Sequence, residues 1–119
     1  MSAYLEQTDD RLFLLRINGE LRKSELDAVQ TELVGKFASA GAVKLLVLLE
    51  NFTGWRRGDE WSDTDFFVQH GDEITKIAVV GHTRWEAQAL AFTGAGLRKA
   101  PVKFFSETGE SEARAWLTE

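Results

Sequence analysis

The residues with the greatest potential for binding chemistry lie in segment 50–58, which reads Glu-Asn-Phe-Thr-Gly-Trp-Arg-Arg-Gly. Phe52 and Trp55 supply apolar surface, and Arg56 and Arg57 supply guanidinium groups that bind carboxylates through paired hydrogen bonds. This combination suits an apolar ligand with an anionic head group. The alternative is that both aromatic rings fold back over the core while the arginines stay in solvent.

More aromatic residues follow along the chain. Trp61, Phe66 and Phe67 fall in a segment with helical features, and Trp85 comes just after an apolar run. Because tryptophan favours positions with one apolar and one wet side, we expect an apolar cleft at one end of the fold. A filled aromatic core uses the same residue types and is the competing interpretation. The expected ligand-binding residues are Phe52, Trp55, Arg56, Arg57, Trp61, Phe67, Thr83 and Trp85.

Catalytic and metal-binding patterns are weak in this chain. Four acids open a predicted helix, where the helix dipole alone favours carboxylates: Asp59, Glu60, Asp63 and Asp65. His82 follows an apolar run, but no nucleophile motif or paired-histidine spacing accompanies it. The chain has no cysteine, which excludes thiolate chemistry. We therefore expect no catalytic residue, no metal and no cofactor.

Length and charge restrict the class of protein. The 119 residues, 44% of them hydrophobic, suffice for one domain with its own core. A net charge of −5 argues against nucleic acid or an anionic membrane surface as the main partner. The first twenty residues lack a basic signal-peptide start, and no apolar run approaches the roughly 20 residues of a membrane span. We expect one soluble, cytoplasmic domain over residues 1–119.

The elements that must position these residues follow from hydrophobic periodicity. Apolar runs predict strands at 3–6, 12–17, 43–49, 74–80 and 102–105, the first two antiparallel. Helical spacing predicts helices at 24–41, 59–70, 83–94 and 110–117. Strands that alternate with helices indicate an α/β fold with a mixed, mostly parallel sheet flanked by helices. Ligands of such sheets bind beyond the carboxyl ends of the strands, here segments 50–58, 81–83 and 106–109.

The helix expected after residue 82 has a specific start signal. Thr83 and Glu86 have the spacing of a capping box, in which each side chain bonds a backbone N–H of the first turn. In the last helix, the pattern turns Ala113, Trp116 and Leu117 inward.

The order of these elements resembles that of a known family. A strand that runs into an F-x-G-W turn at 52–55, a strand at 77–81, a V-x-F-F strand at 102–105 and a closing segment at 112–117 together resemble the SpoIIAA-like, or STAS-like, bacterial proteins. The resemblance implies a mixed sheet flanked by helices, similar to anti-sigma-factor antagonists and to CRAL-TRIO lipid-binding domains. It also implies a hydrophobic or lipid-like small molecule as ligand.

One feature of the anti-sigma-factor antagonists is missing. Their phosphorylatable serine lies in an Asp-Ser-x-Gly motif, whereas segment 55–62 reads Trp-Arg-Arg-Gly-Asp-Glu-Trp-Ser. Two hypotheses follow. The first is a non-enzymatic domain that binds a hydrophobic or lipid-like molecule in an apolar cleft. The alternative is a regulatory module of the antagonist type that docks on a protein partner or forms a homodimer, without the serine motif.

Overall fold

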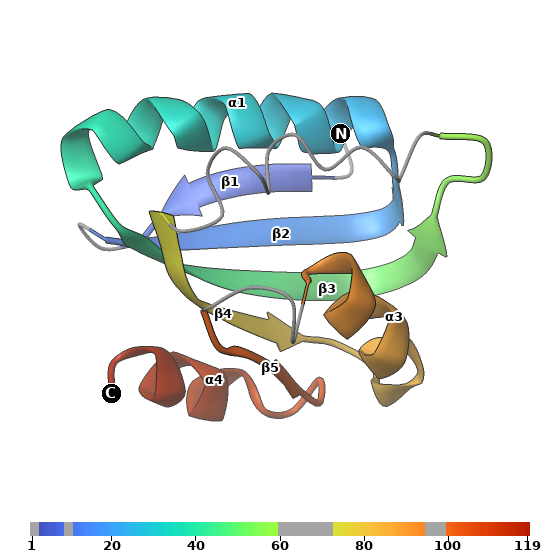
Figure 1. Ribbon diagram of the computed structural model, residues 1–119. Helices are drawn as coiled ribbons and strands as arrows, with labels where there is room; N and C mark the ends of the chain where they lie inside the picture. Colours follow the sequence, from blue (N-terminus) through green and yellow to red (C-terminus); the bar gives the residue numbers. More distant parts are fainter. Residues whose placement is uncertain (1–2, 9–10, 60–72, 95–99) are drawn as a thin grey trace.

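A single five-stranded sheet organises the protein. The structure is a computed structural model that describes residues 3–8, 11–59, 73–94 and 100–119 (Figure 1). Its strands are β1 (Ala3–Gln7), β2 (Leu12–Leu21), β3 (Val43–Trp55), β4 (Ile74–Val80) and β5 (Val102–Phe105), in the order β1-β2-β3-β4-β5. β1 is antiparallel to β2, and every other neighbouring pair is parallel. The predicted mixed, mostly parallel α/β sheet is confirmed.

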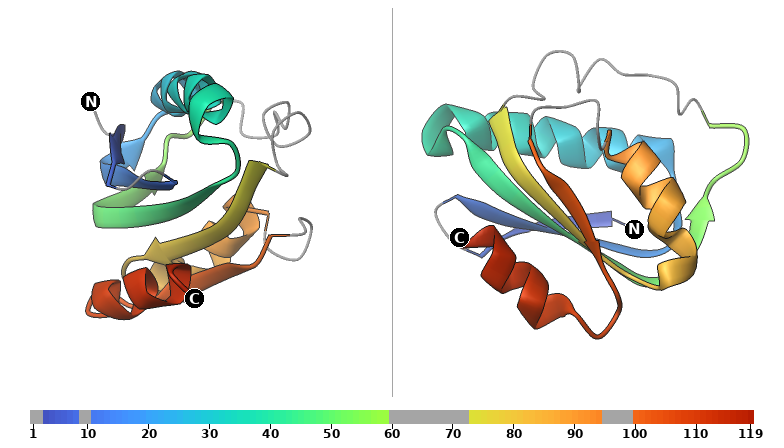
Figure 2. Two further views of the ribbon diagram at one scale, coloured as in Figure 1. Left: turned by 90° about the vertical axis from the view of Figure 1, so that its left-hand side faces the viewer. Right: turned by 60° about the horizontal axis from the view of Figure 1, so that its bottom comes forward.

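Helices cover the sheet from both sides. α1 (Lys23–Ala40) lies across one face and α4 (Glu110–Leu117) packs on the other, as Figure 2 shows edge-on. A short 3₁₀ turn, η2 (Thr83–Trp85), leads into α3 (Glu86–Phe92) after β4. The helix predicted at 59–70 falls almost wholly on residues 60–72, outside the described residues. No helix in the described part of the chain is long and apolar enough to cross a membrane.

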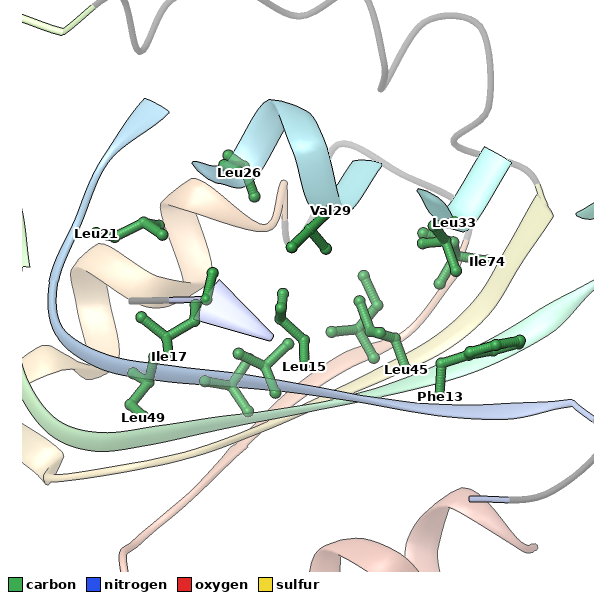
Figure 3. Packing of buried hydrophobic residues seen from close by; sticks show 14 of the residues in the cluster. Phe13, Leu15, Ile17, Leu21, Leu26, Val29, Leu33, Leu45, Leu49 and Ile74 are labelled. Atoms are coloured by element: carbon green, nitrogen blue, oxygen red, sulfur yellow. The ribbon is translucent and has the colours of Figure 1, made fainter. Parts of the chain in front are cut away.

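The larger core lies between α1 and the sheet (Figure 3). Alternate residues of β2 and β3 point toward the helix because successive side chains of a strand face opposite ways. These residues meet the helix face that was predicted from periodicity, and each buried aliphatic side chain contributes about 1.5–3 kcal/mol to folding. The residues of this interface include Phe13, Leu15, Ile17, Leu45, Val47 and Leu49 from the strands, and Leu26, Val29, Leu33 and Phe37 from α1.

The smaller core lies beneath α4. Ala113 and Leu117 are buried, and half-buried Trp116 packs on Phe105 with ring centroids 6.1 Å apart, so the predicted inward face is confirmed. Lys44 and Lys76, paired in register on β3 and β4, donate to carbonyls at the end of α4. Cations at a helix C-terminus are stabilised by the helix dipole. The two lysines therefore help to hold α4 against the sheet.

An ion-pair network joins three strands beside α4. Arg16 Nη1 donates to Glu50 Oε1 at 3.1 Å, and Arg16 Nε lies 3.5 Å from Glu6 Oε1. The hydrogen bond and negative charge of Glu50 raise the pKa of Arg16 above its ordinary value. Both effects favour the charged form of the arginine, which an ordinary arginine already has at physiological pH.

The strands β2 and β3 are longer than predicted. Segment 50–55, expected to be a connection, continues β3, and β2 extends to Leu21, which pairs with Trp55. The register moves from Asn18↔Glu50 to Glu20↔Gly54, so β3 has extra residues and forms a bulge at this point. Positive φ angles at Asn51 (50°) and Gly54 (118°) accommodate the bulge. Asparagine and glycine usually indicate a turn, but here Asn51 and Gly54 allow β3 to bend while it stays paired with β2.

Candidate functional site

Four aromatic side chains, which we term the aromatic cluster, contact one another at the carboxyl end of β3 and in the segments that follow β4. They are Phe52, Trp55, Trp85 and Phe92. The ring of Phe52 lies edge-on to Trp55 and Trp85, with centroids 4.9 and 5.1 Å apart. Trp55 lies 6.1 Å from Trp85 and 5.4 Å from Phe92. These separations are those of contacting rings, so the described members fill the space in which a cleft was predicted.

The bulge in β3 explains how these rings meet. It brings Phe52 and Trp55, both from one strand, against Trp85 of η2. A Cβ atom at Gly54 would lie 3.4 Å from the Trp85 ring, and the positive φ of 118° at this position suits glycine. The glycine thus allows the strand to bend and the indole to pack over its backbone.

The predicted ligand-binding residues divide into three groups. Phe52 is buried, Trp55 and Trp85 are half-buried, and the structure brings these three together. The polar members are all exposed, at Arg56, Arg57 and Thr83. The backbone N–H of Arg56 donates to Leu21 O at 2.9 Å, which ties the start of this segment to β2. The remaining two members, Trp61 and Phe67, lie outside the described residues, as does Phe66.

Asp59 binds the N-terminus of α1. Its Oδ2 accepts a hydrogen bond from the backbone N–H of Lys23 at 2.8 Å, at the N-terminus of α1. A carboxylate at this position satisfies a helix N–H and favours the dipole. Glu60, Asp63 and Asp65 lie outside the described residues. Within residues that the structure describes, no group of three acidic or histidine side chains could hold a metal ion.

The capping box predicted from Thr83 and Glu86 is wrong. Instead, the Nδ1 atom of His82 accepts a hydrogen bond from the backbone N–H of Arg84 at 3.0 Å. The turn begins one residue earlier than the sequence pattern suggests, because a 3₁₀ segment precedes α3. Since Nδ1 acts as acceptor, the proton of the neutral imidazole resides on Nε2, which remains available as a donor.

A hollow of about 140 Å³ lies beside the aromatic cluster, and we term it the polar hollow. Its polar members come from β3 and from the segments that follow β4 and β5, at the edge where ligands of parallel sheets bind. The lining residues are Leu49, Asn51, Phe52, His82, Arg84, Trp85 and Glu107.

Sequence reasoning named the segments of the polar hollow but did not single out Leu49 or three of the polar residues that line it. Asn51 and Glu107 fall within the segments expected to line a site, and Arg84 follows directly after one. Asn51 holds a φ of 50°, the left-handed region that few residues other than glycine adopt. The only signal in the sequence was that these residues follow the predicted end of a strand. That signal does not distinguish a residue that lines the hollow from its neighbours.

Arg84 and Glu107 carry opposite charges but do not form an ion pair with each other. The Cζ atom of Arg84 lies 4.9 Å from the centroid of the Trp85 ring, in a cation–π arrangement. Neither Arg84 nor Glu107 forms an ion pair with another residue in the described chain. The hollow therefore offers a stacked cation and a separate carboxylate to whatever enters it.

Comparison with known proteins identifies the family. The family model described as SpoIIAA-like matches residues 12–118. The chain belongs to the SpoIIAA-like family. No curated protein matches this SpoIIAA-like domain.

Two solved structures share the fold of this SpoIIAA-like domain. An uncharacterized protein from Shewanella loihica PV-4 with a SpoIIAA-like fold has a TM-score of 0.72 and 19% identity, over 97% of this chain and 91% of that chain. The anti-sigma factor antagonist SpoIIAA in its unphosphorylated form has a TM-score of 0.67 and 13% identity, over 98% of this chain and 96% of that chain. At these identities the likeness establishes the architecture.

Proposed function

We propose that this SpoIIAA-like domain is a non-enzymatic, cytoplasmic module that docks a partner protein through its aromatic cluster. The observation that carries the proposal is that the cluster is packed internally and still reaches the surface. Phe92 is 37% exposed and Trp85 is half-buried. Rigid aromatic rings lose little conformational entropy on binding, and tryptophan and arginine are enriched among residues that dominate interface affinity.

Exposed arginines suggest the chemistry of the partner surface. Arg56 and Arg57 follow β3, and Arg84 stacks on Trp85 beside the cluster. A partner that presents carboxylates around an apolar side chain would complement this arrangement. A protein partner also agrees with the solved neighbour described as an anti-sigma factor antagonist. Because the Asp-Ser-x-Gly motif is absent, the proposal includes no serine switch.

The test compares the two exposed large hydrophobic residues of the described chain. Phe92 belongs to the cluster, whereas Tyr4, 48% exposed, lies on β1, an edge strand of the sheet. Proteins captured from lysate by the wild-type chain are quantified by mass spectrometry, purified, and titrated against Phe92→Ser and Tyr4→Ser. We expect Phe92→Ser to weaken the partner by about tenfold or more, as loss of a central aromatic contact does, and Tyr4→Ser to have little effect.

Two outcomes of this experiment contradict the docking proposal. One is equal binding by all three chains, and the other is an equal loss from both substitutions. Light scattering of the isolated chain at several concentrations separates a protein partner from self-association. If the captured protein is a second copy of the chain and Phe92→Ser abolishes that association, the partner is a homodimer subunit.

A second candidate function is binding of a hydrophobic or lipid-like molecule with an acceptor group. The observation that favours it is Trp55 Nε1, which is buried and has no hydrogen-bond partner in the described chain. A buried N–H without an acceptor is uncommon, and a carboxylate head group would satisfy it. The roles of Trp61 and Phe67 in such a site stay predictions.

Fatty acids of several chain lengths test this second candidate. Native mass spectrometry and tryptophan fluorescence report binding, and Trp55→Phe keeps an aromatic ring while removing the N–H. We expect Trp55→Phe to weaken binding by about tenfold, the effect of one lost hydrogen bond to a charged group. If no fatty acid of any chain length gives a bound mass or a change in the fluorescence spectrum, the chain does not bind lipid-like molecules of this class.

A further inference from the structure

The polar hollow contains two opposite charges that share one space without neutralising each other. Arg84 and Glu107 both line it, and neither pairs with another described residue. A single molecule that carries an anionic group and a hydrogen-bond donor would satisfy both side chains at once. Pockets of this kind use a few placed polar groups to orient a ligand.

Arg84 is positioned to receive a carboxylate. Its guanidinium stacks over Trp85, with Cζ 4.9 Å from the ring centroid, which restricts the side chain before any ligand arrives. A planar guanidinium binds a carboxylate through two parallel hydrogen bonds, and restriction in advance lowers the entropy lost on binding.

His82 and Asn51 add neutral hydrogen-bonding groups to the same hollow. His82 uses Nδ1 to accept from the Arg84 backbone, so its Nε2–H is the free donor of the ring. Asn51 is held at a φ of 50° by the bulge in β3. Backbone conformations of this kind persist only where the surroundings impose them and often mark functional sites. The Asn51 amide can both donate and accept.

The size of the hollow determines how much of a ligand it can enclose. Its volume of about 140 Å³ is close to that of an engineered cavity of roughly 150 Å³ that accommodates benzene, so it admits about six to eight heavy atoms. Leu49, Phe52 and Trp85 supply apolar lining for a short carbon skeleton.

We propose that the polar hollow binds a small α-amino or α-hydroxy acid. Arg84 receives the carboxylate, Glu107 accepts from the ammonium or hydroxyl group, and His82 Nε2 donates to a ligand oxygen. This inference goes beyond the docking function. Its test uses free small molecules and no partner protein, so either proposal can fail without the other.

The first experiment compares four probes on the wild-type chain. Serine and lactate carry both groups, acetate carries the carboxylate alone, and ethanolamine lacks it. Backbone amide shifts in ¹H–¹⁵N spectra report binding at Asn51, His82, Arg84 and Glu107. We expect saturable shifts with serine or lactate, and an affinity about tenfold or more above that of acetate and ethanolamine, since each single-group probe leaves one charge unpaired.

The second experiment uses matched charge removals. Arg84→Gln and Glu107→Gln should each weaken serine by about tenfold or more, the effect of one lost charged hydrogen bond. Arg11→Gln and Glu32→Gln remove exposed charges of the same types elsewhere and should leave the affinity unchanged. The proposal is overturned if neither serine nor lactate produces saturable shifts, if acetate binds as tightly as serine, or if Arg84→Gln leaves the affinity intact.

Discussion

The aromatic cluster and the polar hollow lie side by side and share Phe52 and Trp85, yet they differ in how their members are satisfied. In the cluster, rings contact rings at 4.9 to 6.1 Å. In the hollow, a cation and a carboxylate remain apart. Apolar rings gain stability by closing on one another, whereas separated charges gain most from a molecule that reaches both. At this end of the sheet, the aromatic cluster therefore stabilises the fold, whereas the polar hollow is suited to binding a ligand.

The largest expected effect follows from removal of Phe52, the ring at the centre of the aromatic cluster. Phe52→Ala should lower the free energy of unfolding by about 3–5 kcal/mol, because Phe52 is buried and contacts both indoles. Urea denaturation measures the loss. The exposed member provides the control, since Phe92→Ala should cost only about 1 kcal/mol. Equal small losses would mean that the rings do not form a packed unit.

Substitution of Gly81 tests how tightly the chain packs around Leu49, which lines the hollow. A Cβ at Gly81 would lie 2.9 Å from the Cβ of Leu49, which lines the hollow. Gly81→Ala should therefore cost about 1–3 kcal/mol through overpacking. Gly35→Ala is the matched control, because a Cβ there meets nothing within 4 Å, and it should stabilise α1 by about 0.5–1 kcal/mol. Both values come from urea denaturation, and a neutral Gly81→Ala would show that Leu49 can move.

The backbone conformation of Asn51 can be tested by two substitutions. At a φ of 50°, Asn51→Ala should destabilise by about 1 kcal/mol because of the left-handed conformation, whereas Asn51→Gly should be neutral within about 0.5 kcal/mol. The difference between the two substitutions, measured by denaturation, isolates the conformational cost from loss of the amide. Equal stabilities would show that the bulge relaxes.

Arg84 should give the smallest effect on stability. Arg84→Gln removes an exposed cation–π contact with Trp85, which contributes about 0.5–1 kcal/mol. The thermal midpoint should change little while serine affinity falls as described above. A loss beyond about 2 kcal/mol would make Arg84 a structural residue and would remove the contrast between the two regions.

Much of the fold was predictable because its signals are local. The apolar face of α1 is predicted from its helical periodicity, and the central strands β3 and β4 are predicted from their continuous apolar runs. The continuation of β3 past Asn51 was not predictable, since asparagine and glycine in isolation favour a turn. Only pairing with the distant residues Glu20 and Leu21 makes this segment a bent strand.

The alternation of strands and helices in the sequence predicts parallel central strands, and with them which segments follow the carboxyl ends of those strands. Whether Phe52, Trp55 and Trp85 enclose a space or pack against one another depends on the tertiary structure, since the same residue types suit both arrangements. It also brought Asn51, Arg84 and Glu107 to one hollow. Distances between side chains from separate segments depend on strand register and on one bulge, and no local pattern encodes them.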